Sequence, residues 1–276
     1  MGEIAVRLVI CIKGSWQFAS TGRLNCAFKN IESLTTIRVG AVSYLNTKPL
    51  LYAFNHGFKI EGMELVEDYP SRIAAMLLND EIDVGLVPVA IIPKLKEHYI
   101  ITDYCIGAEK EVASVCLFSE VPLQQIETVL LDYQSRTSVA LAKILLEKHW
   151  KQNVLLEEAN ENFTEKINGT TAAVVIGDKA LRQQTISKFK YDLAAEWIEF
   201  TGLPFVFAAW IANKPLPEDF IRQFNEATKE GLKNIDAAVA ENISPYYDLK
   251  KYFTENISYE LTDKKRKGLQ QFLSFL

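Results

Sequence analysis

Short apolar runs alternate with polar turns and amphipathic segments along most of this chain. Residues 37–42 form an apolar run, the loop 43–48 is largely polar, and Pro49 begins a segment with apolar residues at helical spacing. Two further runs, residues 64–69 and 82–90, lead into similar segments. Three successive strand-to-helix units predict a parallel sheet with right-handed crossovers, and ligands of such sheets bind at the carboxyl ends of the strands.

A different pattern separates these units from the rest of the chain. Residues 99–107 and 112–119 are two long strand-like runs around a short charged turn, with no helix between them. We expect these two strands to pair and to act as a hinge between two α/β halves. Beyond them, residues 205–212 are predicted to form a strand that is apolar on both faces, and helices follow to the C-terminus.

This order of elements predicts an α/β fold with two lobes, the second inserted into the first, and a ligand cleft between them. We expect lobe 1 to comprise residues 37–117 and 205–276, and lobe 2 to comprise residues 118–204. Residues 1–36 do not share the residue pattern of the rest of the chain, and we expect them to be a poorly ordered N-terminal extension. Their apolar run, residues 5–12, is shorter than a signal-peptide core, and no later run reaches the length of a membrane span.

The most informative polar segment lies between a predicted strand, residues 128–133, and a predicted helix that continues from Val139. It contains, in order, Ser135, Arg136, Thr137 and Ser138. A helix N-terminus carries unpaired N–H groups and a partial positive charge, so hydroxyl and guanidinium groups there suit a carboxylate or a phosphate. One of these hydroxyl groups could equally serve only as a helix cap. The pattern therefore leaves two interpretations open, helix capping and anion binding.

Further polar side chains follow the other predicted strands: Ser43, Tyr44, Asn46, Thr47, Ser71, Ser114 and Asp178. Ser71 and Asp178 each either cap a helix or face the cleft. Apart from Asp178, these groups are good hydrogen-bond donors and poor bases. A site built from them is suited to bind a small anion and to orient it.

Charge and cysteine content narrow the class of protein. The net charge is −5, so the overall field does not attract nucleic acid or an anionic membrane. The four cysteines lack CxxC spacing and a regular framework: Cys11, Cys26, Cys105 and Cys116. We interpret them as free thiols in a reducing compartment, which predicts a cytoplasmic location.

Several kinds of catalytic chemistry have no signature in this sequence. Its three histidines, His56, His98 and His149, lie near helix ends or in connecting segments, where surface positions are the expectation. There is no metal-ligand spacing, phosphate-binding glycine loop or Gly-x-Ser-x-Gly motif, so we expect no metal and no cofactor. Two hypotheses remain: a solute-binding protein that closes on a small carboxylate, and an enzyme whose reaction depends on orientation more than on strong protein acids and bases.

Four segments, taken in order, resemble the chorismate dehydratases of the futalosine route to menaquinone. They are VSYLNTKPL at residues 42–50, DYQSRTS at 132–138, VIGD at 175–178 and TGLPFVFA at 201–208. The resemblance runs from about Ile37 through the C-terminal helices, and residues 1–36 lie outside it. It implies the type II periplasmic-binding-protein fold, in agreement with the two lobes expected above.

The resemblance also implies a carbon–oxygen lyase that converts chorismate to 3-[(1-carboxyvinyl)oxy]benzoate and water. Loss of the ring C3 proton and of the C4 hydroxyl makes the ring aromatic, which drives the reaction. As hypotheses, Ser135, Arg136, Thr137 and Ser138 hold one carboxylate, Ser43, Asn46 and Thr47 orient the enolpyruvyl side and leaving hydroxyl, and Tyr44, Ser71 and Ser114 contact substrate. Either Asp178 or the enolpyruvyl carboxylate of the substrate accepts the proton. A non-catalytic binding protein for a small carboxylate is the alternative.

Overall fold

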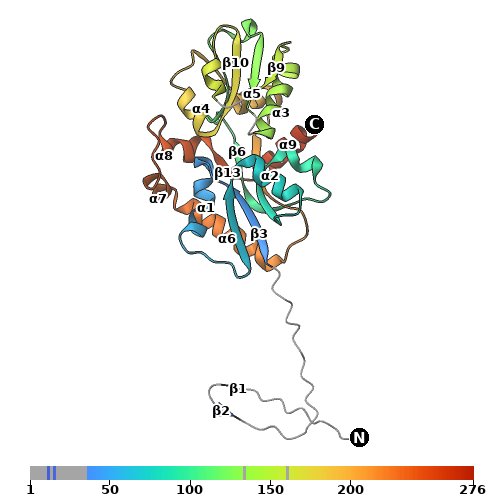
Figure 1. The fold of residues 1–276 in the computed structure, drawn as a ribbon, viewed down its shortest axis with the longest axis vertical. Coiled ribbons are helices and arrows are strands. Elements are labelled where there is room, and N and C mark those ends of the chain that lie inside the picture. Colours follow the sequence, from blue (N-terminus) through green and yellow to red (C-terminus); the bar gives the residue numbers. More distant parts are fainter. Residues whose placement is uncertain (1–10, 13–14, 17–35, 133–134, 160–161) are drawn as a thin grey trace. The chain divides into compact units, whose positions relative to one another are not determined.

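The computed structural model describes residues 11–12, 15–16, 36–132, 135–159 and 162–276 (Figure 1). The chain divides into two compact units, Met1–Thr35 and Thr36–Leu276. In the first unit, β1 (Cys11–Ile12) pairs antiparallel with β2 (Ser15–Trp16). The expectation that residues 1–36 are poorly ordered concerns mostly residues outside the described part. Of this stretch, the structure describes only residues 11–12, 15–16 and 36.

Lobe 1 is built on a six-stranded sheet. Its strands, in spatial order, are β13 (Ser258–Glu260), β6 (Tyr99–Ala108), β12 (Phe205–Ala212), β5 (Val84–Pro88), β3 (Ile37–Val42) and β4 (Met63–Asp68). The strand β3 pairs in parallel with both β4 and β5, which confirms the parallel sheet predicted from three strand-to-helix units. The strand β12 is antiparallel to β5 and β6.

The helices of lobe 1 follow the predicted order in its first half. They are η1 (Leu45–Thr47), α1 (Lys48–Asn55), α2 (Pro70–Leu78), η2 (Val89–Lys94), α6 (Glu218–Lys233), α7 (Ile235–Ala240), α8 (Leu249–Lys251), η6 (Tyr252–Asn256) and α9 (Asp263–Leu273). Proline lies in the first turn of both α1 and α2, where its missing N–H costs nothing. Helices α1 and α6 approach closely at Gly231. A Cβ on this residue would lie only 2.4 Å from the carbonyl oxygen of Pro49.

Lobe 2 is built on a five-stranded sheet. Its strands, in spatial order, are β11 (Phe189–Asp192), β7 (Val115–Ser119), β10 (Thr171–Ile176), β8 (Thr128–Leu131) and β9 (Leu155–Glu158). The strand β8 is parallel to β9 and β10, and β7 is antiparallel to β10 and β11. Its helices are η3 (Leu123–Gln125), α3 (Arg136–Ile144), η4 (Leu145–His149), η5 (Phe163–Lys166), α4 (Gly177–Gln183) and α5 (Leu193–Thr201).

The expected pairing of residues 99–107 with 112–119 is wrong. Both edges of β6 are occupied by β12 and β13 in the first sheet, and both edges of β7 are occupied by β10 and β11 in the second. A strand has only two edges, so these two strands cannot also pair with each other. Between Ala108 and Val115 the chain crosses from the first sheet to the second, and we call this stretch the crossing segment; the chain returns to the first sheet at β12.

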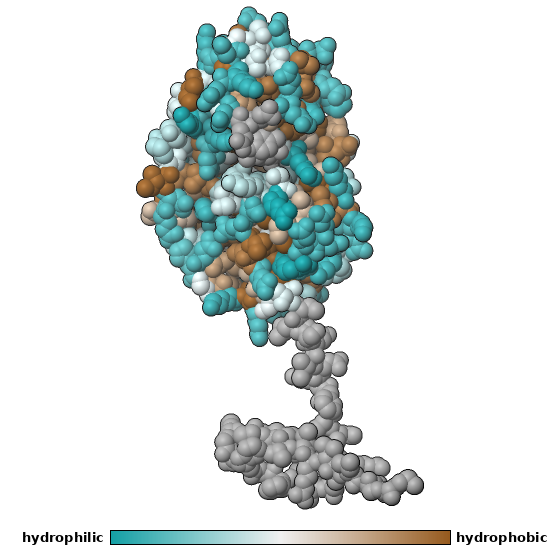
Figure 2. Space-filling view, viewed as in Figure 1, coloured by the Kyte–Doolittle hydropathy of each residue, from teal (hydrophilic) through white to brown (hydrophobic). Residues whose placement is uncertain are grey.

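The C-terminal region also differs from its sequence pattern. The region after residues 205–212 is expected to be helical to the C-terminus, but beyond α7 the structure has the short α8, the π-helical turn η6 and the strand β13 before α9. Aromatic rings join α9 to lobe 2, since Trp197 of α5 packs edge-on against Phe272 of α9 with centroids 6.2 Å apart. Hydrophilic residues cover most of one face, with small hydrophobic patches between them (Figure 2). Among the described residues, no helix has both the length and the apolar character needed to span a bilayer.

Candidate functional site

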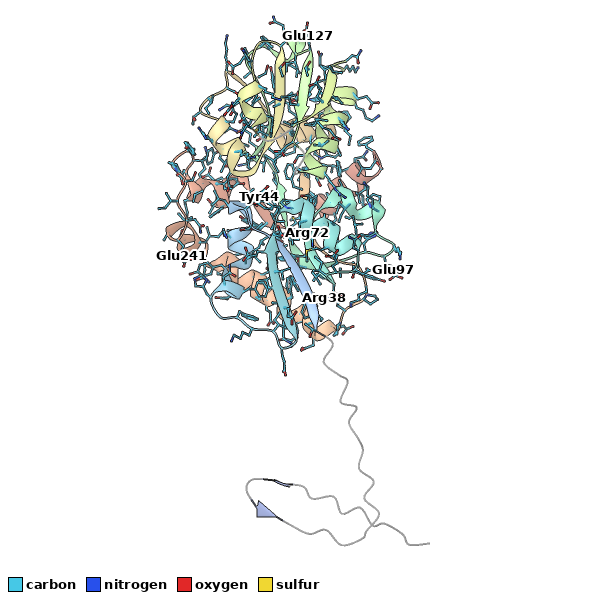
Figure 3. All side chains as sticks on the ribbon, in the orientation of Figure 1. Arg38, Tyr44, Arg72, Glu97, Glu127 and Glu241 are labelled. Carbon is cyan, nitrogen blue, oxygen red and sulfur yellow. The ribbon has the colours of Figure 1, made fainter. Side chains whose placement is uncertain are left out.

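A pocket lies between the two lobes, at the carboxyl ends of strands from both sheets. The final residues of three strands contribute to its lining, namely Val42 of β3, Pro88 of β5 and Ile176 of β10. The strand β3 extends from Arg38 near its start to the loop with Tyr44, which lies where the lobes meet (Figure 3). The pocket is therefore in the position that parallel strand-to-helix units favour.

Seven of the residues singled out from the sequence line this pocket: Tyr44, Asn46, Thr47, Ser114, Ser135, Thr137 and Ser138. Four others do not belong to the lining. Ser43 is exposed, Ser71 is partly buried beside the lining residue Pro70, and Arg136 and Asp178 are exposed near the starts of α3 and α4. Segments far apart in the sequence thus come together at one pocket, while individual residues within those segments point elsewhere.

The start of α3 combines capping with additional hydroxyl groups. Ser135 is the N-cap, and its hydroxyl oxygen accepts the backbone N–H of Ser138 at 3.2 Å. The Ser135 hydroxyl also lies 2.8 Å from that of Ser138. The Thr137 oxygen accepts the backbone N–H of Ala90 in η2, at 3.2 Å, and so links the two lobes. One residue serves as the cap, which leaves hydroxyl groups of Thr137 and Ser138 at the pocket.

The loop after β3 is shaped by its own hydrogen bonds. The Thr47 hydroxyl is buried and lies 2.5 Å from the carbonyl oxygen of Val42 and 2.7 Å from that of Tyr44. The single hydroxyl proton of Thr47 is therefore donated to carbonyl oxygens within the loop. From the other end of the chain, the Tyr259 hydroxyl donates to the carbonyl oxygen of Asn46 at 3.0 Å.

The start of α4 closes one side of the pocket. Gly177 has φ +60°, a conformation that suits glycine, and a Cβ there would lie 3.6 Å from the Tyr44 ring. Its N–H donates to the carbonyl oxygen of Ser114 at 2.8 Å. The next residue, Asp178, keeps contact with solvent, yet partial desolvation raises the pKa of its carboxyl group, and the N–H of Leu45 and the charge of Lys48 oppose that increase. Asp178 thus contacts lobe 1 outside the pocket.

The described lining of the pocket contains no charged side chain and no histidine or cysteine. Hydroxyl, phenol and amide groups supply its polarity, together with the N-terminus of α3. Apolar residues supply the remainder, including Ile106, Val112 and Phe207, which sequence reasoning did not select. The sequence contains one indication of Phe207. Residues 205–212 are apolar on both faces, and a strand of that kind is covered on both sides, so Phe207 was expected to be buried.

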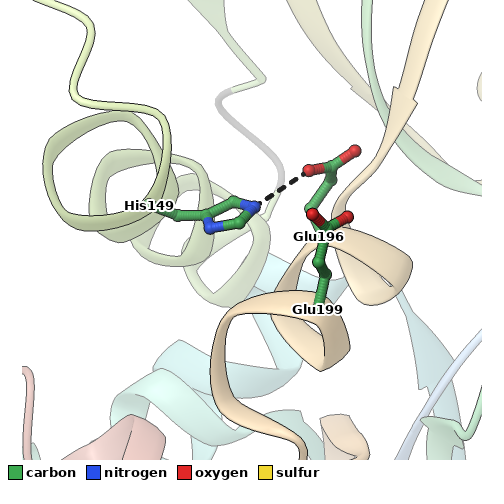
Figure 4. Close-up of side chains that lie close together, drawn as sticks. All are labelled: His149, Glu196 and Glu199. Carbon is green, nitrogen blue, oxygen red and sulfur yellow. Dashed lines mark hydrogen bonds and ion pairs between the residues drawn. The ribbon is translucent and has the colours of Figure 1, made fainter.

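The histidines lie away from this pocket. In lobe 2, His149 Nε2 is 3.2 Å from the Glu196 carboxylate, which also accepts the Trp150 indole N–H at 2.8 Å, and Glu199 lies beside them (Figure 4). One oxygen of Glu196 therefore accepts N–H groups from both His149 and Trp150, and the arrangement is a hydrogen-bonded cluster. His149 is partly buried there, contrary to the expected surface position, because it packs against α5.

Known proteins resemble this chain over most of its length. A family model described as menaquinone biosynthesis matches residues 37–276. Chorismate dehydratase of Thermus thermophilus is 27% identical over 261 residues, covering 86% of this chain and 94% of that protein. Chorismate dehydratase of Campylobacter jejuni is 29% identical over 247 residues, covering 85% of this chain and 95% of that protein.

Solved structures show the same architecture at low sequence identity. A protein of Archaeoglobus fulgidus has a TM-score of 0.69 at 14% identity, covering 87% of this chain and 96% of that one. The periplasmic aliphatic sulphonate binding protein of Escherichia coli has a TM-score of 0.59 at 14% identity, covering 87% and 86%. These similarities confirm the expected two-lobed, periplasmic-binding-protein-like fold. Because the family model spans residues 37–276, this chain belongs to the menaquinone biosynthesis family.

Proposed function

We propose that this protein is a chorismate dehydratase, a hydro-lyase that converts chorismate to 3-[(1-carboxyvinyl)oxy]benzoate and water. Two relatives that carry this name align with the chain over 94% and 95% of their own lengths. The observation that carries the proposal is the interlobe pocket, whose described lining is uncharged and largely apolar, with hydroxyl, phenol and amide groups at the α3 start and in the loop after β3. Such a lining suits a small dicarboxylate that must be held in one orientation.

The start of α3 is the proposed binding site for the ring carboxylate. The hydroxyl groups of Thr137 and Ser138 and the unpaired N–H groups of the helix start are suited to an anion. Ser135 fixes this turn as its cap. Arg136 is exposed outside the lining, so we assign it attraction of the substrate toward the pocket rather than direct contact.

The loop after β3 is the proposed binding site for the enolpyruvyl side and the leaving hydroxyl. Asn46 and Tyr44 line the pocket there, and Ser114 lines it from the crossing segment. Thr47 acts by shaping the loop through its bonds to Val42 and Tyr44. Ser43 and Ser71 lie outside the lining, and we assign them at most indirect effects through their neighbours in the chain.

The proton acceptor is proposed to be the substrate's own enolpyruvyl carboxylate. No carboxylate or imidazole lies in the described lining, and Asp178 is directed to Leu45 and Lys48 outside it. Removal of the C3 proton leaves an electron pair that delocalises into the ring carboxylate, and the C4–O bond then breaks. The proton held by the enolpyruvyl carboxylate joins the leaving hydroxide as water, so charge and atoms balance.

A cytoplasmic location fits this proposal. Cys105 and Cys116 are both free and buried, and burial raises the pKa of Cys105 to about 12. Such thiols remain protonated and unreactive in a reducing compartment.

The experiment is incubation of purified protein with chorismate, with the loss of the diene absorbance followed over time and the product identified by mass. We expect loss of one water and formation of an aromatic product. The other candidate is a protein that binds chorismate without turnover, and the relatives named chorismate dehydratase support the enzyme over this candidate. A thermal shift with chorismate in the absence of any product would support that candidate instead.

A further inference from the structure

The side chain of Tyr259 reaches the loop after β3 from near the C-terminal end of the chain. Its hydroxyl donates to the carbonyl oxygen of Asn46 at 3.0 Å, and the residue is buried. Burial raises the pKa of this phenol well above its ordinary value, so the hydroxyl keeps the proton that it donates. This hydrogen bond fixes the backbone of Asn46, whose side chain lines the pocket.

Two other main-chain oxygens of this loop are held from within the loop itself. The Thr47 hydroxyl lies at hydrogen-bond distance from the carbonyl oxygens of Val42 and Tyr44. The carbonyl oxygen of Asn46 differs from these two, because it accepts a hydrogen bond from an element 213 residues away. The place of the Asn46 side chain in the pocket therefore depends on where β13 holds the Tyr259 hydroxyl.

The strand that carries Tyr259 receives limited support from its sheet. The strand β13 has three residues and lies at the edge of the six-stranded sheet, with β6 as its neighbour. Its register pairs Ser258 with Gly107 and Glu260 with Tyr104, and the register shifts between these two pairs. Such a shift interrupts the ladder of hydrogen bonds at Tyr259 itself.

Lys265 of α9 holds this strand through its backbone. The side chain of Lys265 is fully buried, and its Nζ donates to the carbonyl oxygens of Ser258 at 2.9 Å and Glu260 at 2.5 Å. The Ser258 hydroxyl lies 2.5 Å from the same nitrogen, so three acceptors match the three N–H groups of an ammonium. The carboxylate of Glu109, at 3.7 Å, compensates the buried charge. The backbone is thereby fixed on both sides of Tyr259.

We propose that Tyr259 is a positioning residue for the dehydration: its hydroxyl holds the backbone of Asn46, and Lys265 holds the strand that carries Tyr259. The proposal rests on the function given above. Neither Tyr259 nor Lys265 belongs to the described lining, which comes from residues between 42 and 208, so both act through Asn46. The C-terminal elements β13 and α9 thus set the geometry of a pocket that they do not line.

The test is the substitution Tyr259→Phe, which removes the hydroxyl and keeps the ring. We expect kcat to fall between about 10-fold and about 100-fold with KM changed by less than about threefold, because a displaced orienting group lowers the rate more than the affinity. The melting temperature should also fall, since a hydrogen bond is lost. Full kcat in this variant, whatever its melting temperature, would overturn the proposal, because the bond would then be only structural.

A matched control is Tyr191→Phe in lobe 2. The Tyr191 hydroxyl accepts the backbone N–H of Leu123 at 2.8 Å, outside the pocket lining. This variant should lower the melting temperature and leave kcat unchanged. An equal loss of kcat in Tyr191→Phe would assign the effect of Tyr259→Phe to general loosening of the fold, which contradicts the proposal.

A double variant tests whether Tyr259 acts through Asn46. In the Asn46→Ala background, addition of Tyr259→Phe should bring no further loss of kcat, because the side chain that the hydroxyl positions is already absent. Losses that multiply in the double variant would mean that Tyr259 has an independent role, and the proposal would be wrong.

The part assigned to Lys265 is tested by Lys265→Met, which removes the amine and keeps most of the side-chain volume. A folded variant should lose at least as much kcat as Tyr259→Phe. If Lys265→Met does not fold, Ser258→Ala decides, because it removes one of the three acceptors of the amine and keeps the backbone carbonyl groups. It should lower kcat by about threefold. Full kcat in the deciding variant would remove Lys265 from the proposal.

The failure of this inference can be distinguished from failure of the proposed function. If the unmodified protein converts chorismate and Tyr259→Phe does so equally well, only the inference fails. If the unmodified protein does not convert chorismate, the proposed function fails, and calorimetric titration with chorismate decides the positioning role. A loss of affinity in Tyr259→Phe that disappears in the Asn46→Ala background would then retain that role, and any other result would remove it.

Discussion

The two walls of the pocket differ in how completely their polar groups are paired. At the start of α3 in lobe 2, Ser135 and Ser138 contact each other, and Thr137 accepts an N–H group from lobe 1. In lobe 1, Oδ1 of Asn46 and Oγ of Ser114 are buried without a hydrogen-bond partner among the described residues. The lobe 2 wall is therefore organised before a ligand arrives, whereas the lobe 1 wall is completed on binding. We expect the first to control affinity and the second to control turnover.

The largest effect that would test this division is that of Asn46→Ala. Loss of a hydrogen-bond donor to developing charge should lower kcat by about 100-fold or more, while chorismate still binds. Stopped-flow or steady-state rates, with affinity from calorimetry, provide the measurement. Turnover equal to that of the unmodified protein would remove Asn46 from the site, and loss of binding alone would reverse the assigned roles of the two walls.

The complementary substitution in lobe 2 is Ser138→Ala, which removes one hydroxyl from the start of α3. The helix cap is retained, because the backbone N–H of residue 138 still donates to the Ser135 hydroxyl oxygen. A hydrogen bond to a carboxylate is worth about 1.5–3 kcal/mol, so KM should rise by about 10-fold or more. We expect kcat to change by less than about threefold, because the contact is present before and during the reaction. A fall in kcat at constant KM would show that this wall also acts in the rate-limiting step.

Lobe 2 is joined to the crossing segment by Asp192, outside the pocket lining, and the titration of this carboxyl group predicts a pH dependence of stability. Its carboxylate caps α5 and accepts the N–H of Ala113 at 2.7 Å. Burial raises its pKa from 3.8 to about 6, despite these backbone N–H groups. The native state binds more protons than the unfolded state between these values, so this contribution is present below pH 4 and is lost as the pH rises through about 6.

The corresponding loss in the free energy of unfolding is at most about 3 kcal/mol, at 1.36 kcal/mol per pKa unit. Urea unfolding between pH 4 and pH 8 should show this slope, and Asp192→Asn should flatten it. The exposed Asp219 is a control, because Arg222 lowers its pKa and Asp219→Asn should leave the slope unaltered in this range. An identical slope in Asp192→Asn would assign the dependence to another group.

The smallest expected effect is that of Asp178→Asn. If the substrate's own carboxylate accepts the proton, this variant should retain kcat within about threefold, since it loses only an exposed contact with lobe 1. The same chorismate assay measures it. A fall of about 100-fold or more would identify Asp178 as the base, and the uncharged lining would then be an incomplete description of the reacting site.

Local patterns predicted the elements that form from neighbouring residues. The units built on β3, β4 and β5 and the polar start of α3 follow from apolar runs and turn residues close together in the sequence. The edge strand β9 was missed because all four of its residues are exposed, so burial imposes no alternation on them. The pairing of β6 and β7 was mispredicted because an apolar run does not specify which strand becomes its neighbour.

The candidate site was predicted in its segments and less well in its individual residues. Asn46, Ser114 and Thr137 line the pocket, whereas Arg136 and Asp178, on the same turns as lining residues, do not. A sequence pattern locates a turn, but the direction of each side chain depends on backbone geometry that only the folded chain supplies. Tyr259 contacts Asn46 from 213 residues away, and no local signal could have indicated that contact.

Gly177 has a consequence for how this sequence can diverge over generations. Its positive φ and the adjacent Tyr44 ring mean that any replacement both strains the backbone and fills the pocket. We therefore expect drift among descendants of this gene to leave position 177 unchanged while the exposed neighbours Asp178 and Lys179 vary. Even alanine at this position, whose Cβ would lie in ordinary contact 3.6 Å from the Tyr44 ring, would impose the backbone strain of a positive φ.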